Sequence, residues 1–525
     1  MSKEQPPLQF SHVDIHYNYV FDVGGQVNPI DAARQVLGTD LGQAFRNYAT
    51  GKSEVADRYR VWVETFEKLT QLRDDLEKIE TGQNLAGHLK LVLLNPKLYG
   101  VAYLRALKAA ISPSRHREET DRQDDGEIDA AIGEVAEAIA DLLGLLAFQE
   151  HVDREILYSG YMESVPFARV GLQPFGAVID ELETDFDVTL TIHRSGIAIL
   201  SAYGVFRGSM PLDQVLRLQR ASQLPVKEFD LPSRAIQRYL SLVTGHAPNE
   251  KQTREFETSN PSTRRGYVRL EADEDSVLLG AFDAYRYFLI EAIQGKRFRS
   301  IDDLHSQLRS SHWRAYPMLF IKRTDPSYPS SAAFKEEQAE VLARLVIGCD
   351  SSWAVKAGMI KETCDQDLSL VDDYSLYLTE GSGAAICYED YLKVPPSIAA
   401  NEWIRQKFLT TVVVDMLLLQ RGLLSTLDVY LDKARYDASR LNDLRKEYLL
   451  GLEELEALRI SYYGSVHDII KHGQRVWRID ELRSSFLAKL DSIEGLIAVA
   501  ENRQRASRER VAKTLTSVAA AVSAL

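Results

Sequence analysis

The sequence predicts an α+β protein: a mixed α/β middle domain, an added helical N-terminal region and a long C-terminal helical stalk. Three observations support this prediction. Short runs of β-branched and aromatic residues, separated by turn residues, recur through the middle third of the chain. Apolar residues at helical spacing dominate the segments before that third. No proline follows Pro396, and the apolar residues beyond it keep a helical period.

The 525 residues exceed the usual size of one hydrophobic core, and we expect three regions, 1–160, 161–396 and 397–525. Hydrophobic residues make up 45% and charged residues 26% of the chain, as in folded globular proteins. The formal net charge of −14 argues against general nucleic-acid binding, which requires clustered cations.

The chain has three cysteines, too few for a disulfide framework. It shows neither a secretory signal nor a run of about 18–20 apolar residues. We therefore predict a cytoplasmic protein.

The N-terminal region begins with a predicted strand from Gln9 to Val23, which Gly24 and Gly25 end. Asn28 and Pro29 then form a helix start, because asparagine caps the free N–H groups and proline suits the first helical position. Further helices are expected at about 54–80, 85–110 and 127–157, with a polar loop at 112–126.

The middle region alternates between strands and helices. The clearest hairpin is expected at 374–388, where two apolar runs flank Gly381-Ser382-Gly383. A strand pair is expected at 187–203, around His193-Arg194-Ser195-Gly196. Other strands are expected at 267–270 and 316–321, helices at 211–221 and 276–294, and a polar loop at 246–265.

The C-terminal region predicts three long helices, at about 397–436, 438–472 and 478–525. A last helix of about 48 residues would be roughly 70 Å long. Because this exceeds the diameter of a domain, we expect the helix to pack on the other two helices or on partners.

One motif resembles a phosphate-binding loop. Gly51-Lys52-Ser53 matches the end of that loop, but Arg46 stands where its first glycine is needed, and Leu41–Tyr48 is helix-like. We therefore predict that Gly51 ends a helix. No zinc-type histidine or cysteine spacing and no Gly-x-Ser-x-Gly elbow occurs, so an enzyme is not favoured. An active site assembled from distant residues of the middle domain stays an alternative.

Acidic residues gather before the 187–203 strand pair. Carboxylates favour hard divalent cations, so these residues are candidate ligands for Mg²⁺, the one cofactor that the sequence suggests; the alternative is a solvated surface. The candidate metal residues are Asp180, Glu181, Glu183, Asp185 and Asp187.

Basic residues gather near the C-terminus of this acidic chain, and residues 514–525 after them carry no charged side chain. A helix that enters a bilayer from the cytoplasmic side has this order, whereas an alanine-rich coiled-coil end is the alternative. The candidate membrane-surface residues are Arg503, Arg505, Arg508, Arg510 and Lys513.

The order of parts resembles the CorA-type divalent-metal transporters, in which a mixed α/β cytoplasmic domain precedes a long helix that runs into the membrane. The closest local likeness is Asp491–Leu525, where Ala512-Lys513-Thr514-Leu515-Thr516 precedes small apolar residues. The leucine-rich and charged segment Asn442–Arg459 also fits. The chain has neither the family's Gly-Met-Asn signature nor a second span. We therefore expect a cytoplasmic portion cut before the membrane, or a scaffold without the channel.

The resemblance implies a non-enzymatic homo-oligomer at the inner face of the cell membrane, either part of a metal-ion transporter or a channel-derived sensor. The alternative is a soluble helical interaction scaffold of a bacterial defence or stress complex. The last helix contacts lipid if the protein is CorA-like, and it contacts a partner protein if the protein is a scaffold.

Overall fold

The computed structural model describes residues 8–47, 52–57, 167–179, 181–220, 224–245, 250–262, 264, 266–271, 277–309, 314–388, 396–434, 438–457 and 464–523. The fold is α+β, as predicted, with a mixed β-sheet between layers of helices. The chain divides into two units, Met1–Lys52 with Phe148–Leu525, and Ser53–Ala147. The expected helices at 85–110 and 127–157, the loop at 112–126 and most of the expected helix at 54–80 lie outside the described residues.

The sheet of the first unit has the strand order β10-β11-β9-β1-β6-β5-β4-β2, and β7 and β8 extend it beside β4. The pairings recorded among the described strands of this unit are antiparallel, except that β9 and β11 are parallel. The strands are β1 (Gln9–Asp22), β2 (Gly42–Asn47), β4 (Phe167–Ile179), β5 (Leu182–His193), β6 (Ile197–Pro211), β7 (Glu228–Pro232), β8 (Tyr267–Glu271), β9 (Arg314–Asp325), β10 (Tyr374–Leu378) and β11 (Gly383–Cys387). A further strand, β3, covers Lys52–Val55.

β1 lies in the middle of this sheet, between β6 and β9, although it comes from the N-terminal region. Alternate side chains of β1 therefore enter two separate apolar cores. Val13, Ile15 and Tyr17 belong to the core on one face. The other face packs on the C-terminal helices. Regions 1–160, 161–396 and 397–525 thus each contribute elements to the same unit.

The first core lies beneath helices that come mainly from the middle of the chain. Asn28 caps the first of these helices as predicted, because its side-chain oxygen accepts from the N–H groups of Ile30 and Asp31. The helices are α1 (Pro29–Leu37), α6 (Leu212–Leu218), α7 (Ser233–Thr244), α8 (Glu250–Ser259), α9 (Leu279–Gln294), α10 (Ile301–Gln307), α11 (Ser331–Ile347) and α12 (Ala357–Asp365).

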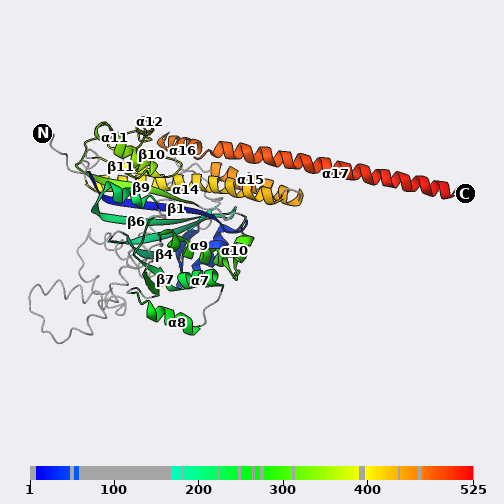
Figure 1. The fold of residues 1–525 in the computed structure, drawn as a ribbon, viewed down its shortest axis with the longest axis horizontal. Helices are drawn as coiled ribbons and strands as arrows, with labels where there is room; N and C mark the ends of the chain where they lie inside the picture. The colour runs from blue at the N-terminus through cyan, green and yellow to red at the C-terminus, as the bar shows by residue number, and fades with distance from the viewer. Residues whose placement is uncertain are drawn as a thin grey trace, which may run out of the picture. The chain divides into compact units, whose positions relative to one another are not determined.

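The second core lies between the sheet and the C-terminal helices α14 (Pro396–Ala434), α15 (Ala438–Ala457), α16 (Gly464–Val476) and α17 (Ile479–Ser523). Figure 1 shows α14 along β1 and β9 on one side of the sheet, with α9 and α10 on the other. The apolar run Val412–Leu419 of α14, with its single charge at Asp415, fills this core. The three predicted C-terminal helical stretches are therefore present, and the second is recorded as α15 and α16.

Two local predictions were wrong. Residues 42–47 form strand β2, because the main chain of Ala44 and Phe45 pairs with β4, and tertiary pairing outweighs local helix propensity. Strand β2 therefore precedes Gly51 in place of the expected helix, and Gly51 itself lies outside the described residues. Part of the expected polar loop at 246–265 is helix α8, whose residues favour helices and which packs on the core through Phe256.

Candidate functional site

The first half of α17 packs on the other C-terminal helices. Phe486 and Leu490 are fully buried in the second core, and Phe486 stacks on Tyr448 of α15 with 5.3 Å between the ring centroids. Lys489 binds Asp428 of α14, and Arg445 of α15 binds Asp491 and Glu494. These contacts hold α17 in place from Ile479 to about Glu494.

The longer C-terminal part of α17, residues 495–523, which we call its second half, continues past the end of α15, as Figure 1 shows. Its 29 residues from Gly495 to Ser523 correspond to roughly 43 Å of helix. Several large apolar side chains on it are mostly exposed: Leu496 at 68%, Val499 at 50%, Val511 at 57% and Leu515 at 64%. Residues three or four apart share a helix face, so Leu496 with Val499, and Val511 with Leu515, form exposed apolar pairs.

The predicted membrane-surface residues all lie on this exposed half. The side chains of Arg505, Arg508, Arg510 and Lys513 are exposed, whereas the side chain of Arg503 is outside the described part. Positions 508 and 510 are about 200° apart around a helix, so the cations surround α17 instead of forming one stripe. We call residues 503–513 the basic segment.

The predicted metal residues do not form a compact cluster. Along β5, Glu183, Asp185 and Asp187 are exposed and alternate with buried side chains, while Asp180 lies outside the described residues. Three of the carboxylates face cations: Glu181 faces Lys227 at 3.5 Å, Asp185 contacts Arg264, and Glu183 lies 4.0 Å from Arg269. Among the described side chains, no three histidine, cysteine, aspartate or glutamate residues come close enough together to hold a metal ion. The proposed Mg²⁺ site therefore stays a prediction.

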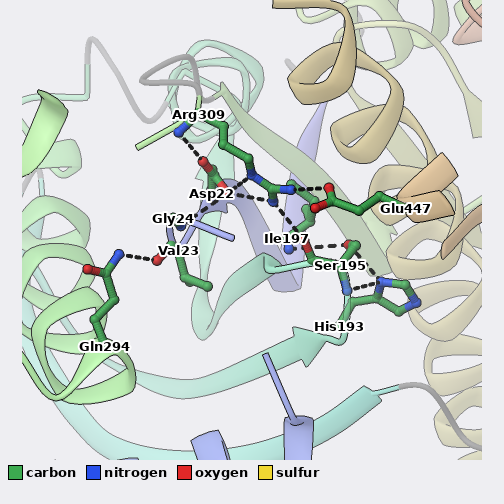
Figure 2. A network of polar contacts seen from close by, with 9 residues as sticks. All are labelled: Asp22, Val23, Gly24, His193, Ser195, Ile197, Gln294, Arg309 and Glu447. Carbon is green, nitrogen blue, oxygen red and sulfur yellow. Dashed lines mark hydrogen bonds and ion pairs between the residues drawn. The ribbon is translucent and has the colours of Figure 1, made fainter. Parts of the chain in front are cut away.

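A buried ionic junction connects the sheet to α15, as Figure 2 shows. Asp22, at the end of β1, is fully buried and accepts three hydrogen bonds from Arg309: from its backbone N at 2.7 Å, Nη2 at 2.9 Å and Nε at 3.2 Å. The same guanidinium donates to Glu447 of α15 at 2.6 Å and to the carbonyl of Ser195 at 2.6 Å. Arg309 thus joins β1, the β5–β6 turn and α15.

The electrostatics of the junction favour a charged Arg309. Burial opposes the charge, but Asp22 and Glu447 outweigh it and raise the pKa of Arg309. Burial also raises the pKa of Glu447, and Arg309 only partly offsets this increase. The three charges therefore depend on one another.

Glycines allow the backbone to approach closely at this junction. Gly24 and Gly196 both have positive φ, at 102° and 81°. The N–H of Val23 donates to the carbonyl of Gly196 at 2.9 Å, which joins the end of β1 to the β5–β6 turn. A Cβ on Gly196 would lie 1.8 Å from the carbonyl oxygen of Gly25. A Cβ on Gly24 would instead meet the side chain of Gln294, so the two glycines are required by separate contacts.

His193 and Ser195 in the same turn have the residue types of a nucleophile and its base. Their Nδ1 and Oγ atoms are 2.8 Å apart. His193 is fully buried and Ser195 is 2% exposed, and Gly451 of α15 packs over both side chains. Burial, followed by the charge of Arg194, lowers the pKa of His193 to about 3. No substrate can reach this pair, so we assign it to the structure of the turn and not to hydrolysis.

Further buried polar contacts join the sheet to α14. Asp415 of α14 pairs with Arg169 of β4, and Arg169 also donates to Thr191 at 3.1 Å. Burial raises the pKa of Asp415 to about 6, against the opposing effect of Arg169. Lys407 of α14 pairs with Asp14 of β1. Of these residues, only Asp415 stands out in the sequence, because it is a charge in an apolar run. The sequence does not indicate that Arg169 is its partner.

No helix within the described ranges has an apolar stretch of the length that a bilayer crossing requires. No family model, curated protein or solved structure matches the chain.

Proposed function

We propose that this protein is a non-enzymatic assembly protein whose α+β part positions α17, and that the second half of α17 joins copies of the chain next to an anionic membrane surface. In this proposal the protein acts as a CorA-like cytoplasmic assembly, as part of a metal-ion transporter or as a sensor derived from a channel. The proposal rests on two surfaces of the exposed half of α17: its exposed apolar side chains and the basic segment.

The first support is the apolar surface. Leu496, Val499, Val511 and Leu515 are at least half exposed on a helix whose first half buries the same kind of residue. A long helix gains most of its stability from packing an apolar face, so these side chains require a partner. Copies of α17 supply one for Val511 and Leu515, which lie within about 20° of Phe486 around the helix and so continue the stripe that packs on α14 and α15. Leu496 and Val499 lie about 80° and 140° from Phe486 and form a separate apolar surface.

The second support is the basic segment. It brings five cations to residues 503–513 of a chain with a net charge of −14, and residues 514–525 are uncharged. Cations distributed around a helix suit one that meets a layer of anionic head groups with its end, because every side then faces phosphate.

Vesicle flotation tests this proposal. The test variant changes Arg503, Arg505, Arg508, Arg510 and Lys513 to glutamine. At about 1 kcal/mol for each cation near an anionic surface, five cations contribute roughly 5 kcal/mol, so binding to phosphatidylglycerol vesicles should fall more than a hundredfold. Vesicles of phosphatidylcholine alone should recover little of either protein.

The matched control removes five exposed cations elsewhere: Arg207, Lys296, Arg297, Lys356 and Lys361. This control has the same total charge as the test variant and should float like the wild type at low salt. Equal flotation of both variants would contradict a role for the basic segment.

A second candidate is a helical interaction scaffold that binds protein instead of lipid. The exposed pair Leu496 and Val499 favours it, because both residues precede the basic segment. Light scattering on the chain and on a version that ends at Gly495, which lacks Leu496 and Val499, separates the two proposals. A scaffold loses its partner or oligomeric state on truncation, with no dependence on lipid.

A further inference from the structure

A cavity of about 660 Å³ lies at one end of the sheet, away from the basic segment and the Arg309 junction. Its walls come from the ends of four strands: Ser11 of β1, Ser209 of β6, Lys322–Asp325 of β9, and Cys387 of β11 with Tyr388 after it. Pockets of about 300–1,000 Å³ are typical of small-molecule sites. The size of the cavity therefore suits a ligand as large as a nucleotide.

The topology places this cavity where open sheets commonly bind ligands. β9 and β11 are the parallel pair, and Lys322–Asp325 and Cys387 lie at the carboxyl ends of those two strands. β9 is also the strand at which the sheet changes from antiparallel pairing, with β1, to parallel pairing. Crevices outside the carboxyl ends of parallel strands are common ligand sites of open α/β sheets.

A β-bulge directs polar side chains to the cavity. The register of β1 with β6 shifts between Ser11 and Val13, and His12 between them has φ of 52°. Beyond the bulge, Ser209, Ser11 and Arg323 occupy one row across β6, β1 and β9. Bulges turn the following side chains to the other face of a strand and often adjoin binding sites. Hydroxyl groups and a cation thus line one wall.

Two cations at the cavity are not neutralised. Lys322 is half-buried and Arg323 exposed, and neither forms an ion pair within the described part of the chain. The other described cations that line buried regions, such as Arg169, Arg309 and Lys407, each bind a carboxylate. Unpaired cations favour the binding of phosphate oxygens, and the Ser11 hydroxyl lies beside them, whereas the hydroxyl of Ser209 donates to Oε1 of Gln9.

Asp325 and Cys387 limit the chemistry further. Counted from Lys322, Arg323 and Asp325, the net charge of the lining is +1. This small charge disfavours a bare polyanion and suits a ligand that also has hydroxyl groups. Burial raises the pKa of the Cys387 thiol, so it stays protonated and does not attack the ligand. The lining thus has the groups for binding but no activated nucleophile at Cys387.

We propose that this cavity binds a small molecule with both phosphate and hydroxyl groups, of the class of sugar phosphates and nucleoside monophosphates, with Lys322 and Arg323 on the phosphate. The proposal is independent of α17 and of the membrane.

Isothermal titration of the full chain with ribose 5-phosphate and with AMP tests it, with ribose and adenosine as phosphate-free probes. We expect at least one phosphorylated probe to bind at least tenfold more tightly than its phosphate-free counterpart. Changing both Lys322 and Arg323 to glutamine should weaken that binding at least tenfold, whereas K322R with R323K, which keeps both charges, should retain most of it.

The matched control changes Lys251 and Arg254 to glutamine in a second basic hollow, on α8. Binding that is unchanged in this control supports the β9–β11 cavity as the site. An equal loss in the control, or no binding of either phosphorylated probe at 10 mM (about the weakest affinity that titration detects), would overturn the proposal.

Discussion

Replacement of Arg309 by methionine is the sharpest test of the buried junction. Methionine keeps a similar apolar stem but removes the charge, and with it the side-chain hydrogen bonds to Asp22, Glu447 and the carbonyl of Ser195. The side chain of Asp22 is 0% exposed, so its carboxylate would remain buried without the guanidinium, while the backbone N–H groups of Gly24 and residue 309 stay in place as donors.

The expected cost follows from that burial. Breaking a buried ion pair by removing one partner costs about 3–5 kcal/mol, because the other charge stays away from water. Changing Glu447 to glutamine should cost less than Arg309→Met, since burial already opposes the charge of Glu447 and Asp22 keeps its arginine. The double change of Asp22 to asparagine and Arg309 to methionine should recover part of the loss, because the fully buried carboxylate of Asp22 is then absent.

Urea denaturation followed by circular dichroism measures these differences. A loss below 1 kcal/mol for Arg309→Met would refute the reasoning. A double variant whose loss of stability exceeds the sum of the losses of Asp22→Asn and Arg309→Met would also refute it.

Three further predictions concern the same unit. Gly196→Ala should destabilise it by more than about 3 kcal/mol in urea denaturation, since the new Cβ would meet the carbonyl oxygen of Gly25 and φ of Gly196 is positive. The control is Gly208→Ala in β6, which has open space around its Cα and should be nearly neutral. Folding lowers the pKa of His193 from 6.5 to about 3, so its contribution to stability is complete above pH 6.5 and is lost as the pH falls toward 3. Between pH 7.5 and 5 it should remove about 2 kcal/mol, and His193→Gln should flatten the stability–pH profile by that amount; an unchanged profile would show that the buried histidine takes up a proton. Folding raises the pKa of Asp415 to about 6, so this group acts in the opposite direction and lowers stability as the pH rises from 4 to 6. Asp415→Asn should remove that slope of stability against pH, even if it lowers stability at every pH. A retained slope would contradict the raised pKa of Asp415.

Local signals were sufficient to predict many elements. The strand at Gln9–Asp22 and the helix that begins at Pro29 follow from residues within a few positions, because β-branched runs and an asparagine cap act locally. The hairpin at β10 and β11 follows in the same way from its glycine-rich turn. The position of β1 at the middle of the sheet could not be predicted, since its neighbours β6 and β9 lie about 180 and 300 residues later.

The buried polar contacts were beyond the sequence for a related reason. Asp22 and Arg309 are 287 residues apart, and Arg169 and Asp415 are 246 residues apart. A charge inside an apolar run, as at Asp22 and Asp415, signals that a partner is required, because an unpaired buried charge is too costly. Which of 62 lysines and arginines supplies it depends on the tertiary fold.

The sequence was informative about α17, because its helical period, the basic segment and the uncharged residues 514–525 can be read directly from the sequence. It could not show where packing ends, because the residues before and after Glu494 have similar spacing. That limit depends on the lengths of α14 and α15, which support only the first half of α17.

Hydrogen–deuterium exchange along α17 tests the central claim most directly, which is that its second half is covered in the assembled state. The amides of residues 479–490 serve as an internal reference, because that part is packed in every state. With anionic vesicles, or at rising protein concentration, residues 496–515 should exchange at least tenfold more slowly while the reference is unchanged. Exchange in residues 496–515 that stays equally fast under both conditions would contradict the account.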